Sequence, residues 1–197
     1  MKSDIILAGV GGQGILSIAT VLGTAALADD LYIKQAEVHG LSQRGGDVQS
    51  NLRLSSEPVA SDLIPLAGAD LIISMEPMEA LRYLPYLSPQ GWIVTSTIPV
   101  VNIANYPPME RVMEELEQID NVVALDMDSI ARSVASARAA NMVLLGAASP
   151  FIDLEPDAIR DAIHTIFAPK GPNIVDANVK AFNAGRDFAL TMSSSNK

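Results

Sequence analysis

Two short segments of this chain concentrate groups that could take part in chemistry. Residues 35–46 read QAEVHGLSQRGG and combine a carboxylate, an imidazole, a hydroxyl, an amide and a guanidinium with two adjacent glycines. Residues 9–14 read GVGGQG and contain the G-x-G-x-x-G pattern, whose glycines allow a tight turn and expose backbone N–H groups at a helix start. Both segments could therefore receive an anionic group, or the glycines of residues 9–14 could serve only to let the strand-to-helix turn pack tightly.

The candidate site residues are the members of these segments that can turn the backbone, donate a hydrogen bond or carry charge. Adjacent glycines can adopt positive φ and form an anion-binding nest, and arginine adds a planar fork suited to carboxylate or phosphate. The imidazole can be either a hydrogen-bonded strut or a general base. The candidates are Gly9, Gly11, Gly12, Gln13, Gly14, Glu37, His39, Ser42, Gln43, Arg44, Gly45 and Gly46.

Glu37 has two competing interpretations. It lies 23 residues after Gly14, where a dinucleotide-binding fold places the acid that binds the ribose. It could instead pair with Arg44 or Lys34. A nicotinamide dehydrogenase also needs a proton-transferring residue and a substrate pocket, and the chain has neither a Tyr-x-x-x-Lys pattern nor room for a separate substrate domain.

Composition excludes several classes of function. The net charge is −10, which disfavours binding to nucleic acid or to an anionic membrane surface. No cysteine is present, and the two histidines, His39 and His164, lie far apart in the sequence. The chain therefore supplies no thiolate to an iron–sulfur cluster, and we expect no metal site in it.

The first 28 residues are apolar enough to suggest a targeting segment, but their glycines interrupt the run. The helical part after Gly14 is about 14 residues long, whereas about 20 are needed to span a bilayer. We therefore expect a cytoplasmic protein without a membrane segment, and the absence of cysteine agrees with this.

The elements that must position the two segments alternate along the chain. Strands are expected at residues 5–10, 31–38, 48–54, 70–74, 91–97 and 121–126, and helices at 15–28, 76–84, 129–145, 155–167 and from 173 onward.

Alternation of apolar strands and helices predicts an α/β fold, with a mostly parallel sheet covered by helices on both faces. The segment 48–54 alternates apolar and polar residues and is the expected exception, an antiparallel strand. Residues 1–192 are expected to form one domain and 193–197 a disordered tail. If the first two strands end side by side, residues 9–14 and 37–46 converge at one crevice.

Three polar residues outside these segments are given structural interpretations. Glu76 and Glu79 suit the start of a helix, where a carboxylate complements the dipole. Asn141 lies in an apolar helical stretch, where a buried amide needs partners, and it could brace a loop from within.

Taken together, the motifs resemble the small Rossmann-like subunit of the 2-oxoacid:ferredoxin oxidoreductases, called gamma in several of these enzymes. The similarity is greatest to the beta subunit of indolepyruvate ferredoxin oxidoreductase. The segments that carry the resemblance cover nearly the whole chain and read IILAGVGGQGILSIA, KQAEVHGLSQRGGDVQSNLR, SDLIP, ADLIISMEPMEALRYL, ANMVLLGA and NVKAFNAGR.

The resemblance implies a three-layer Rossmann-like sandwich and a subunit of an enzyme that decarboxylates a 2-oxo acid oxidatively to an acyl-CoA. The complex would use thiamine diphosphate, Mg and [4Fe-4S] clusters, all on a large alpha subunit, and would pass electrons to ferredoxin. This chain would bind no cofactor by itself. Its residues 11–14 and 37–46 would face the partner, with Ser42, Gln43 and Arg44 closing the pocket or holding CoA or the substrate carboxylate.

Alternatives remain at this point. The chain could be the gamma subunit of a pyruvate, 2-oxoisovalerate or 2-oxoglutarate ferredoxin oxidoreductase, and the sequence does not name the 2-oxo acid. It could also be a stand-alone dinucleotide-binding protein, or a scaffold whose crevice has lost its function.

Overall fold

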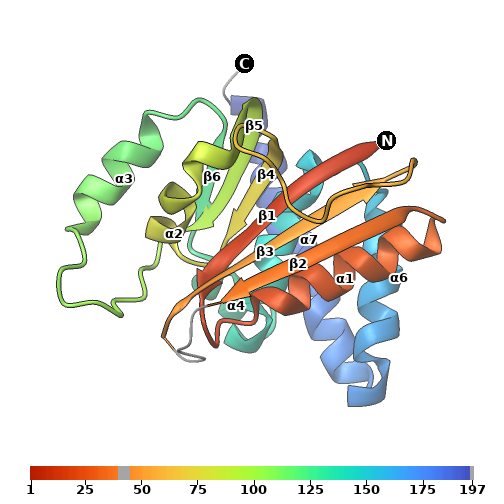
Figure 1. The fold of residues 1–197 in the computed structure, drawn as a ribbon. Coiled ribbons are helices and arrows are strands. Elements are labelled where there is room, and N and C mark those ends of the chain that lie inside the picture. The colour runs from red at the N-terminus through yellow and green to blue at the C-terminus, as the bar shows by residue number, and fades with distance from the viewer. Residues whose placement is uncertain (40–44, 196–197) are drawn as a thin grey trace.

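Six strands form a single mixed sheet in the computed structural model of the protein, which describes residues 1–39 and 45–195 (Figure 1). The order of the strands across the sheet is β2-β3-β1-β4-β5-β6. Their bounds are β1 Lys2–Val10, β2 Tyr32–His39, β3 Asp47–Ser55, β4 Ala69–Ser74, β5 Leu87–Ser96 and β6 Val122–Leu125.

The third strand is the antiparallel one, as its alternating sequence predicted. β3 runs antiparallel to both β1 and β2, while β1, β4, β5 and β6 pair in parallel. The prediction that the first two strands end side by side is wrong, because β3 is inserted between them. β3 nevertheless begins beside the carboxyl end of β1, since Asp47 pairs with Val10.

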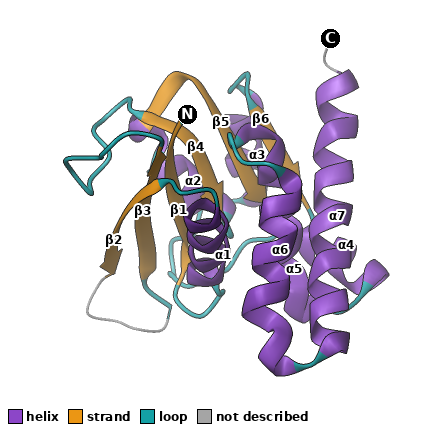
Figure 2. Cartoon of the chain, turned by 90° about the vertical axis from the view of Figure 1, so that its right-hand side faces the viewer, coloured by secondary structure: helices purple, strands orange, loops and turns teal. Residues whose placement is uncertain are grey.

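Helices cover both faces of the sheet, which confirms the predicted fold class (Figures 1 and 2). Ile5 and Leu7 of β1 belong to a core cluster with α1 and α4–α7, whereas Ile6 and Ala8 belong to a second cluster with α2 and α3. The helices are α1 Ile15–Ala28, α2 Pro77–Arg82, α3 Met109–Glu117, α4 Met127–Val134, α5 Ala140–Ala148, α6 Pro156–Phe167 and α7 Pro172–Ser195, with short 3-10 turns at Leu84–Tyr86, Ala137–Ala139, Ser149–Phe151 and Ala168–Lys170.

The helix predicted over residues 129–145 is in fact two helices, α4 and α5. The backbone leaves the helical region at Ala135 and is extended at Ser136, whose side chain then accepts a hydrogen bond from the backbone N–H of Arg138 at 3.4 Å. The 3-10 turn that follows leads into α5. This break brings Arg138 and Asn141 close to the residues that follow the carboxyl end of β1.

α5 and α7 pack against each other through glycines. A Cβ atom added at Gly146 would lie 1.9 Å from the carbonyl oxygen of Phe182, and one added at Gly185 would lie 1.9 Å from the carbonyl oxygen of Val143. The two backbones therefore touch directly, which no residue larger than glycine would allow. Both glycines fall in segments that carried the resemblance, ANMVLLGA and NVKAFNAGR.

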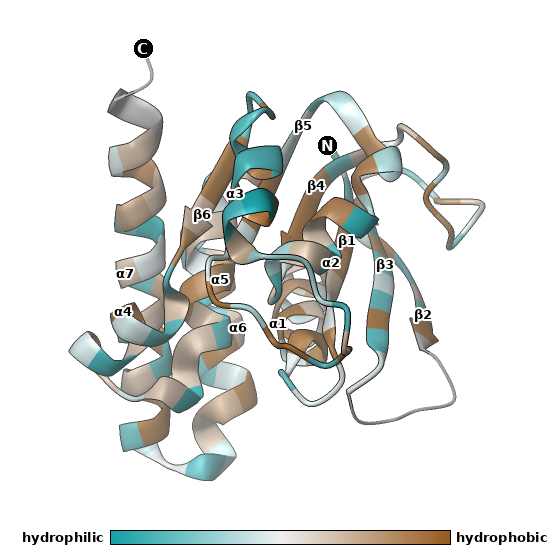
Figure 3. Cartoon of the chain, turned by 90° about the vertical axis from the view of Figure 1, so that its left-hand side faces the viewer, coloured by the Kyte–Doolittle hydropathy of each residue, from teal (hydrophilic) through white to brown (hydrophobic). Residues whose placement is uncertain are grey.

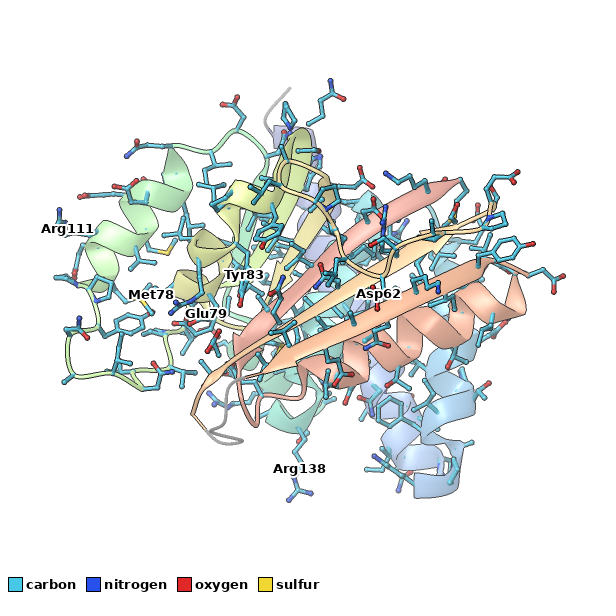
Figure 4. The ribbon with its side chains drawn as sticks, viewed as in Figure 1. Asp62, Met78, Glu79, Tyr83, Arg111 and Arg138 are labelled. Atoms are coloured by element: carbon cyan, nitrogen blue, oxygen red, sulfur yellow. The ribbon has the colours of Figure 1, made fainter. Side chains whose placement is uncertain are left out.

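A buried ion pair anchors the long connection between β3 and β4. Asp4 on β1 accepts hydrogen bonds from Nε and Nη2 of Arg53 on β3, at 2.7 and 2.9 Å. The remaining nitrogen, Nη1, donates to the carbonyl oxygens of Ser61 and Leu63. Asp62 of the same connection is drawn in front of the strands in Figure 4.

Burial opposes ionisation of the Asp4 carboxyl. The hydrogen bonds and charges of Arg53 and Lys2 outweigh that effect, and they hold the pKa of Asp4 below its ordinary value.

Two further sequence expectations concern the ends of the fold and the membrane. α7 is helical to Ser195, so the expected domain boundary at residue 192 falls inside its last turn. Among the described residues, no helix is both long and apolar enough to cross a bilayer.

Candidate functional site

The turn between β1 and α1 is held closed by the side chain of Gln13. Its Oε1 accepts a hydrogen bond from the backbone N–H of Val10 at 2.7 Å, and its Nε2 donates to the carbonyl oxygen of Met75 at 3.0 Å. A Cβ atom at Gly9 would lie 3.0 Å from that Oε1 atom, so glycine there leaves room for the amide. Gln13 therefore braces the turn from inside.

The other glycines of the turn give it its shape. Gly12 and Gly14 have φ angles of 103° and 82°, a region that side chains disfavour, and both are exposed. Gly14 is the N-cap of α1 and has no side chain, so no side chain accepts the first backbone N–H groups of this helix, although the Ser17 N–H donates to the carbonyl oxygen of Gly14 at 3.0 Å. The turn can therefore offer N–H donors to an anionic group.

Two other segments converge on this turn. The backbone N–H of Gly11 donates to the carbonyl oxygen of Gly46 at 2.8 Å, and Nδ2 of Asn102 donates to the carbonyl oxygen of Gly45 at 2.8 Å. Gly45 itself has a φ of 76°. The expected convergence of the two glycine segments thus occurs through β3, and a loop after β5 joins them.

A cleft of about 420 Å³ opens beside the turn. It is bounded by the N-terminal ends of α1, α4 and α5 and is lined by Gly12, Gln13, Gly14, Met75, Met127, Asp128, Ala137, Arg138, Ala140 and Asn141.

The cleft has one cation and one incompletely bonded amide on its α4–α5 side. Arg138 is exposed, and its side chain projects away from the sheet (Figure 4). Asn141 Nδ2 donates to the carbonyl oxygen of Gly14 at 3.5 Å, which agrees with the expectation that this amide braces a loop. Its Oδ1 atom is buried and has no hydrogen-bond partner in the described part of the chain.

Two buried carboxylates lie next to the site at the start of α2. Glu76 and Glu79 are each about 1% exposed. Glu76 caps α2 by accepting the N–H of Glu79 at 2.8 Å, and it also accepts a hydrogen bond from the phenol of Tyr106. The role at a helix start was predicted, but the burial was not.

Burial is the main cause of the raised pKa values of Glu79, Tyr83 and Tyr106. It raises the pKa of Glu79, although the guanidinium of Arg82, 2.7 Å away, acts in the opposite direction. Burial together with nearby Asp47 and Glu79 raises the pKa of Tyr83 to about 12, and burial with the bond to Glu76 raises the pKa of Tyr106. Both phenols therefore remain protonated donors at neutral pH. Glu79 on α2 and Tyr83, directly after the end of this helix, lie close together in Figure 4.

The remaining predicted residues are placed as follows. Glu37 lies on the edge strand β2, separated from β1 by β3, and its carboxylate accepts a hydrogen bond from Nε2 of Gln35 at 3.0 Å. His39 is the last residue of β2. Ser42, Gln43 and Arg44 lie outside the described residues.

The sequence has no cysteine, and no group of three or more histidine, aspartate or glutamate residues in the described chain could hold a metal ion. The arrangement offers a cleft beside the glycine turn, lined by one cation, Arg138, and one acid, Asp128.

Tyr106 and Arg138 were not singled out from the sequence. Each acts through a loop whose path depends on tertiary packing, so residue spacing gave no signal for them.

Comparison with known proteins gives a consistent result. The family described as pyruvate ferredoxin/flavodoxin oxidoreductase matches residues 4–188. The indolepyruvate oxidoreductase subunit IorB of Methanothermobacter thermautotrophicus is 34% identical over 94% of this chain and 96% of its own length. The subunit IorB of Pyrococcus horikoshii is 36% identical over 96% of each chain.

A solved structure shares the fold. The 2-oxoglutarate:ferredoxin oxidoreductase of Magnetococcus marinus, determined with 2-oxoglutarate, coenzyme A and succinyl-CoA bound, superposes with a TM-score of 0.75 at 22% identity. The match covers 96% of this chain but 31% of that one. In that protein the fold is thus one part of a longer chain.

Proposed function

Because this chain belongs to the pyruvate ferredoxin/flavodoxin oxidoreductase family, as a subunit of a 2-oxoacid:ferredoxin oxidoreductase, we propose that it is the subunit without cofactors in an indolepyruvate-type enzyme. The similarity to two IorB subunits over nearly the full length of each chain carries this proposal. The absence of cysteine supports it, because a cluster-bearing subunit needs thiolate ligands.

The proposed reaction converts an aryl 2-oxo acid and coenzyme A to the acyl-CoA and CO2. Two electrons pass to ferredoxin and one proton is released. Thiamine diphosphate, bound with Mg by the large subunit, supplies the carbanion chemistry, and [4Fe-4S] clusters on the same subunit carry the electrons. The residues of this chain bind and orient: the N–H groups of Gly12 and Gly14 are available as donors, because those of Gly11 and Gln13 already bond to Gly46 and Val10, and Arg138 offers positive charge to a carboxylate or phosphate.

The geometry beside the turn supports an active-site-completing role. The cleft is open, lies at the carboxyl end of β1, and combines helix N-termini with Arg138, although Asp128 in its lining carries the opposite charge. Carboxyl ends of parallel strands are where ligands bind in open α/β sheets. Coenzyme A and the substrate carboxylate both present the negative charge that such a cleft accepts.

Co-expression with the large subunit tests the function. The purified complex is assayed for reduction of ferredoxin or a dye against indolepyruvate, phenylpyruvate, pyruvate, 2-oxoisovalerate and 2-oxoglutarate, with and without coenzyme A. We expect CoA-dependent turnover, fastest with the aryl substrates, and none from the isolated chain. Preference for an aliphatic substrate would reassign the chain to the corresponding gamma subunit.

The cleft is tested in the same complex with Arg138→Ala. Loss of a hydrogen bond to a charged group costs about 1.5–3 kcal/mol, so KM for CoA or for the 2-oxo acid should rise at least about tenfold. Arg138→Lys should recover part of this loss, and Lys180→Ala, which removes an exposed charge on α7, should have no effect. Unchanged KM values for both substrates in Arg138→Ala would reject the role of the cleft.

The dinucleotide alternative is tested on the isolated chain by calorimetry with NAD. The position of Glu37 on β2, with β3 between it and the glycine turn, argues against a shared ribose site. NAD binding that Glu37→Ala weakens would favour that alternative over the proposed subunit role.

A further inference from the structure

The loop between β5 and α3 exposes apolar side chains beside the candidate site. Residues 97–105, here called the apolar loop, read TIPVVNIAN and carry no charge. Ile98, Val101 and Ile103 are 41%, 69% and 40% exposed. Apolar side chains gathered in this way on a protein surface mark an interaction site more often than isolated ones do.

The apolar loop is held in place at both ends. Ser96 Oγ accepts the N–H of Ile98 at 3.0 Å, and the buried carboxylate of Glu76 accepts the N–H of Val100 at 3.4 Å and the phenol of Tyr106. A loop fixed before binding loses little conformational entropy when a partner covers it. The exposed side chains are therefore presented in a preorganised form.

The apolar loop is also tied to the site. Asn102, between Val101 and Ile103, donates its 2.8 Å hydrogen bond to the carbonyl oxygen of Gly45. The next residue, Gly46, accepts the N–H of Gly11 in the β1–α1 turn. A partner that covers the loop therefore also reaches the glycine segments.

An acidic helix flanks the apolar loop. α3 follows it directly and is coloured hydrophilic in Figure 3, whereas the sheet behind it is largely hydrophobic. Val112 and Leu116 face the core, and the only cation of the helix, Arg111, points outward in Figure 4. The exposed acids of α3 are Glu110, Glu114, Glu115 and Glu117.

We propose that the apolar loop and the acidic face of α3 form one docking surface for the large subunit, which covers Val101 and Ile103 with apolar side chains and meets α3 with lysine or arginine. This inference rests on the proposed function, because it names the surface through which the chain binds the large subunit. In the Magnetococcus marinus structure, the shared fold is one part of a longer chain.

A second copy of the same chain fits this surface less well. A two-fold interface places the same patch on both sides, so the acidic face of one α3 would lie near that of the other. Like charges brought together in this way are unfavourable, whereas a basic partner gains in association rate and specificity.

The test measures binding of the isolated chain to the purified large subunit by surface plasmon resonance. Val101→Asp places a charge at the centre of the surface, and Glu114→Lys reverses a charge on its acidic side. The matched control is Leu27→Asp, which puts the same charge at a 66% exposed position at the far end of α1. Circular dichroism establishes that all three variants fold like the wild-type chain.

We expect Kd to rise at least tenfold for Val101→Asp and several-fold for Glu114→Lys, to stay within twofold for Leu27→Asp, and to rise with salt in the wild type. Binding of Val101→Asp like wild type, in a complex that turns over a 2-oxo acid, would overturn the docking surface and leave the function intact. A complex that forms through this surface but turns over no 2-oxo acid would overturn the function alone. Light scattering that shows a dimer of the wild-type chain and a monomer of Val101→Asp would assign the surface to a second copy instead.

Discussion

Substitution of Gly185 by alanine tests the packing of α5 against α7. The added Cβ would lie 1.9 Å from the carbonyl oxygen and 2.7 Å from the carbonyl carbon of Val143, whereas an ordinary contact begins at 3.4 Å. The missing 1.5 Å cannot come from a flexible side chain, because the obstructing atoms are backbone. The two helices must therefore move apart or bend.

The loss in free energy of unfolding depends on the side chains that α5 and α7 bury between them. Leu144, Ala147, Phe182 and Ala189 are all fully buried. A separation of only about 0.5–1 Å between α5 and α7 already removes about a quarter to a half of the dispersion energy of each contact that it stretches. Overpacking usually costs about 1–3 kcal/mol, and backbone-to-backbone overlap belongs at the upper end, so we expect about 3 kcal/mol or more.

The assay is urea and thermal unfolding followed by circular dichroism and by fluorescence of Trp92. This is the single tryptophan of the chain, and it stacks on Phe151, just beyond α5, with ring centroids 4.0 Å apart. For a domain of this size, 3 kcal/mol corresponds to a fall in Tm of about 6–12 °C. The double variant Gly146→Ala/Gly185→Ala should lose less than the sum of the single variants, since one separation relieves both overlaps.

Gly23→Ala provides the matched control, because Gly23 lies within α1 and an added Cβ there would meet nothing within 4 Å. This variant should be more stable than the wild type by about 0.5–1 kcal/mol, since alanine is the better helix former. A stability of Gly185→Ala within about 0.5 kcal/mol of the wild type would refute the packing argument.

Three further predictions concern the polar contacts. Asp4→Asn should lower the free energy of unfolding by about 3 kcal/mol at pH 7, because it leaves the largely buried Arg53 unpaired. Since the folded pKa of Asp4 is lowered, its contribution is present above the ordinary pKa and is lost as pH falls through the folded pKa. Urea unfolding should therefore show the difference from wild type shrinking below about pH 4, and a pH-independent difference would contradict this. Tyr106→Phe removes a donor from buried Glu76 and should cost about 1–3 kcal/mol, with faster hydrogen exchange at the Val100 amide; unchanged exchange there would show that Glu76 does not hold the loop. Asn102→Ala should change stability by less than about 1 kcal/mol, because the residue is exposed, but should lower turnover of the reconstituted complex by loosening Gly45. Full turnover with Asn102→Ala would mean that this contact does not position the site.

Much of the fold could be predicted from local patterns. The helix at residues 15–28 has the predicted bounds, since a glycine turn before it and charged residues after it mark both ends. The alternating segment 48–54 identified the antiparallel strand. The break between α4 and α5 was missed because no glycine or proline marks it, although Ala135 and Ser136 leave the helical region there.

The candidate site was predictable in its glycine segments and less so in its surroundings. Backbone conformation at Gly12, Gly14 and Gly45 follows from residue type, because positive φ favours glycine. The ribose interpretation of Glu37 assumed neighbouring first strands, an assumption that the insertion of β3 removes. Burial of Glu76 depends on a loop 24 residues away that folds back over it, and no local pattern reports such a contact.

The central position of β1 has a consequence for how the chain folds. β1 precedes both of its hydrogen-bonding partners, β3 and β4, in the sequence. Until they emerge from the ribosome, β1 presents two open edges and the apolar run Ile5–Ala8, which is fully buried in the finished sheet. The nascent chain is therefore exposed to aggregation until about residue 74 is available, and sheet formation must wait for contacts that are distant in sequence.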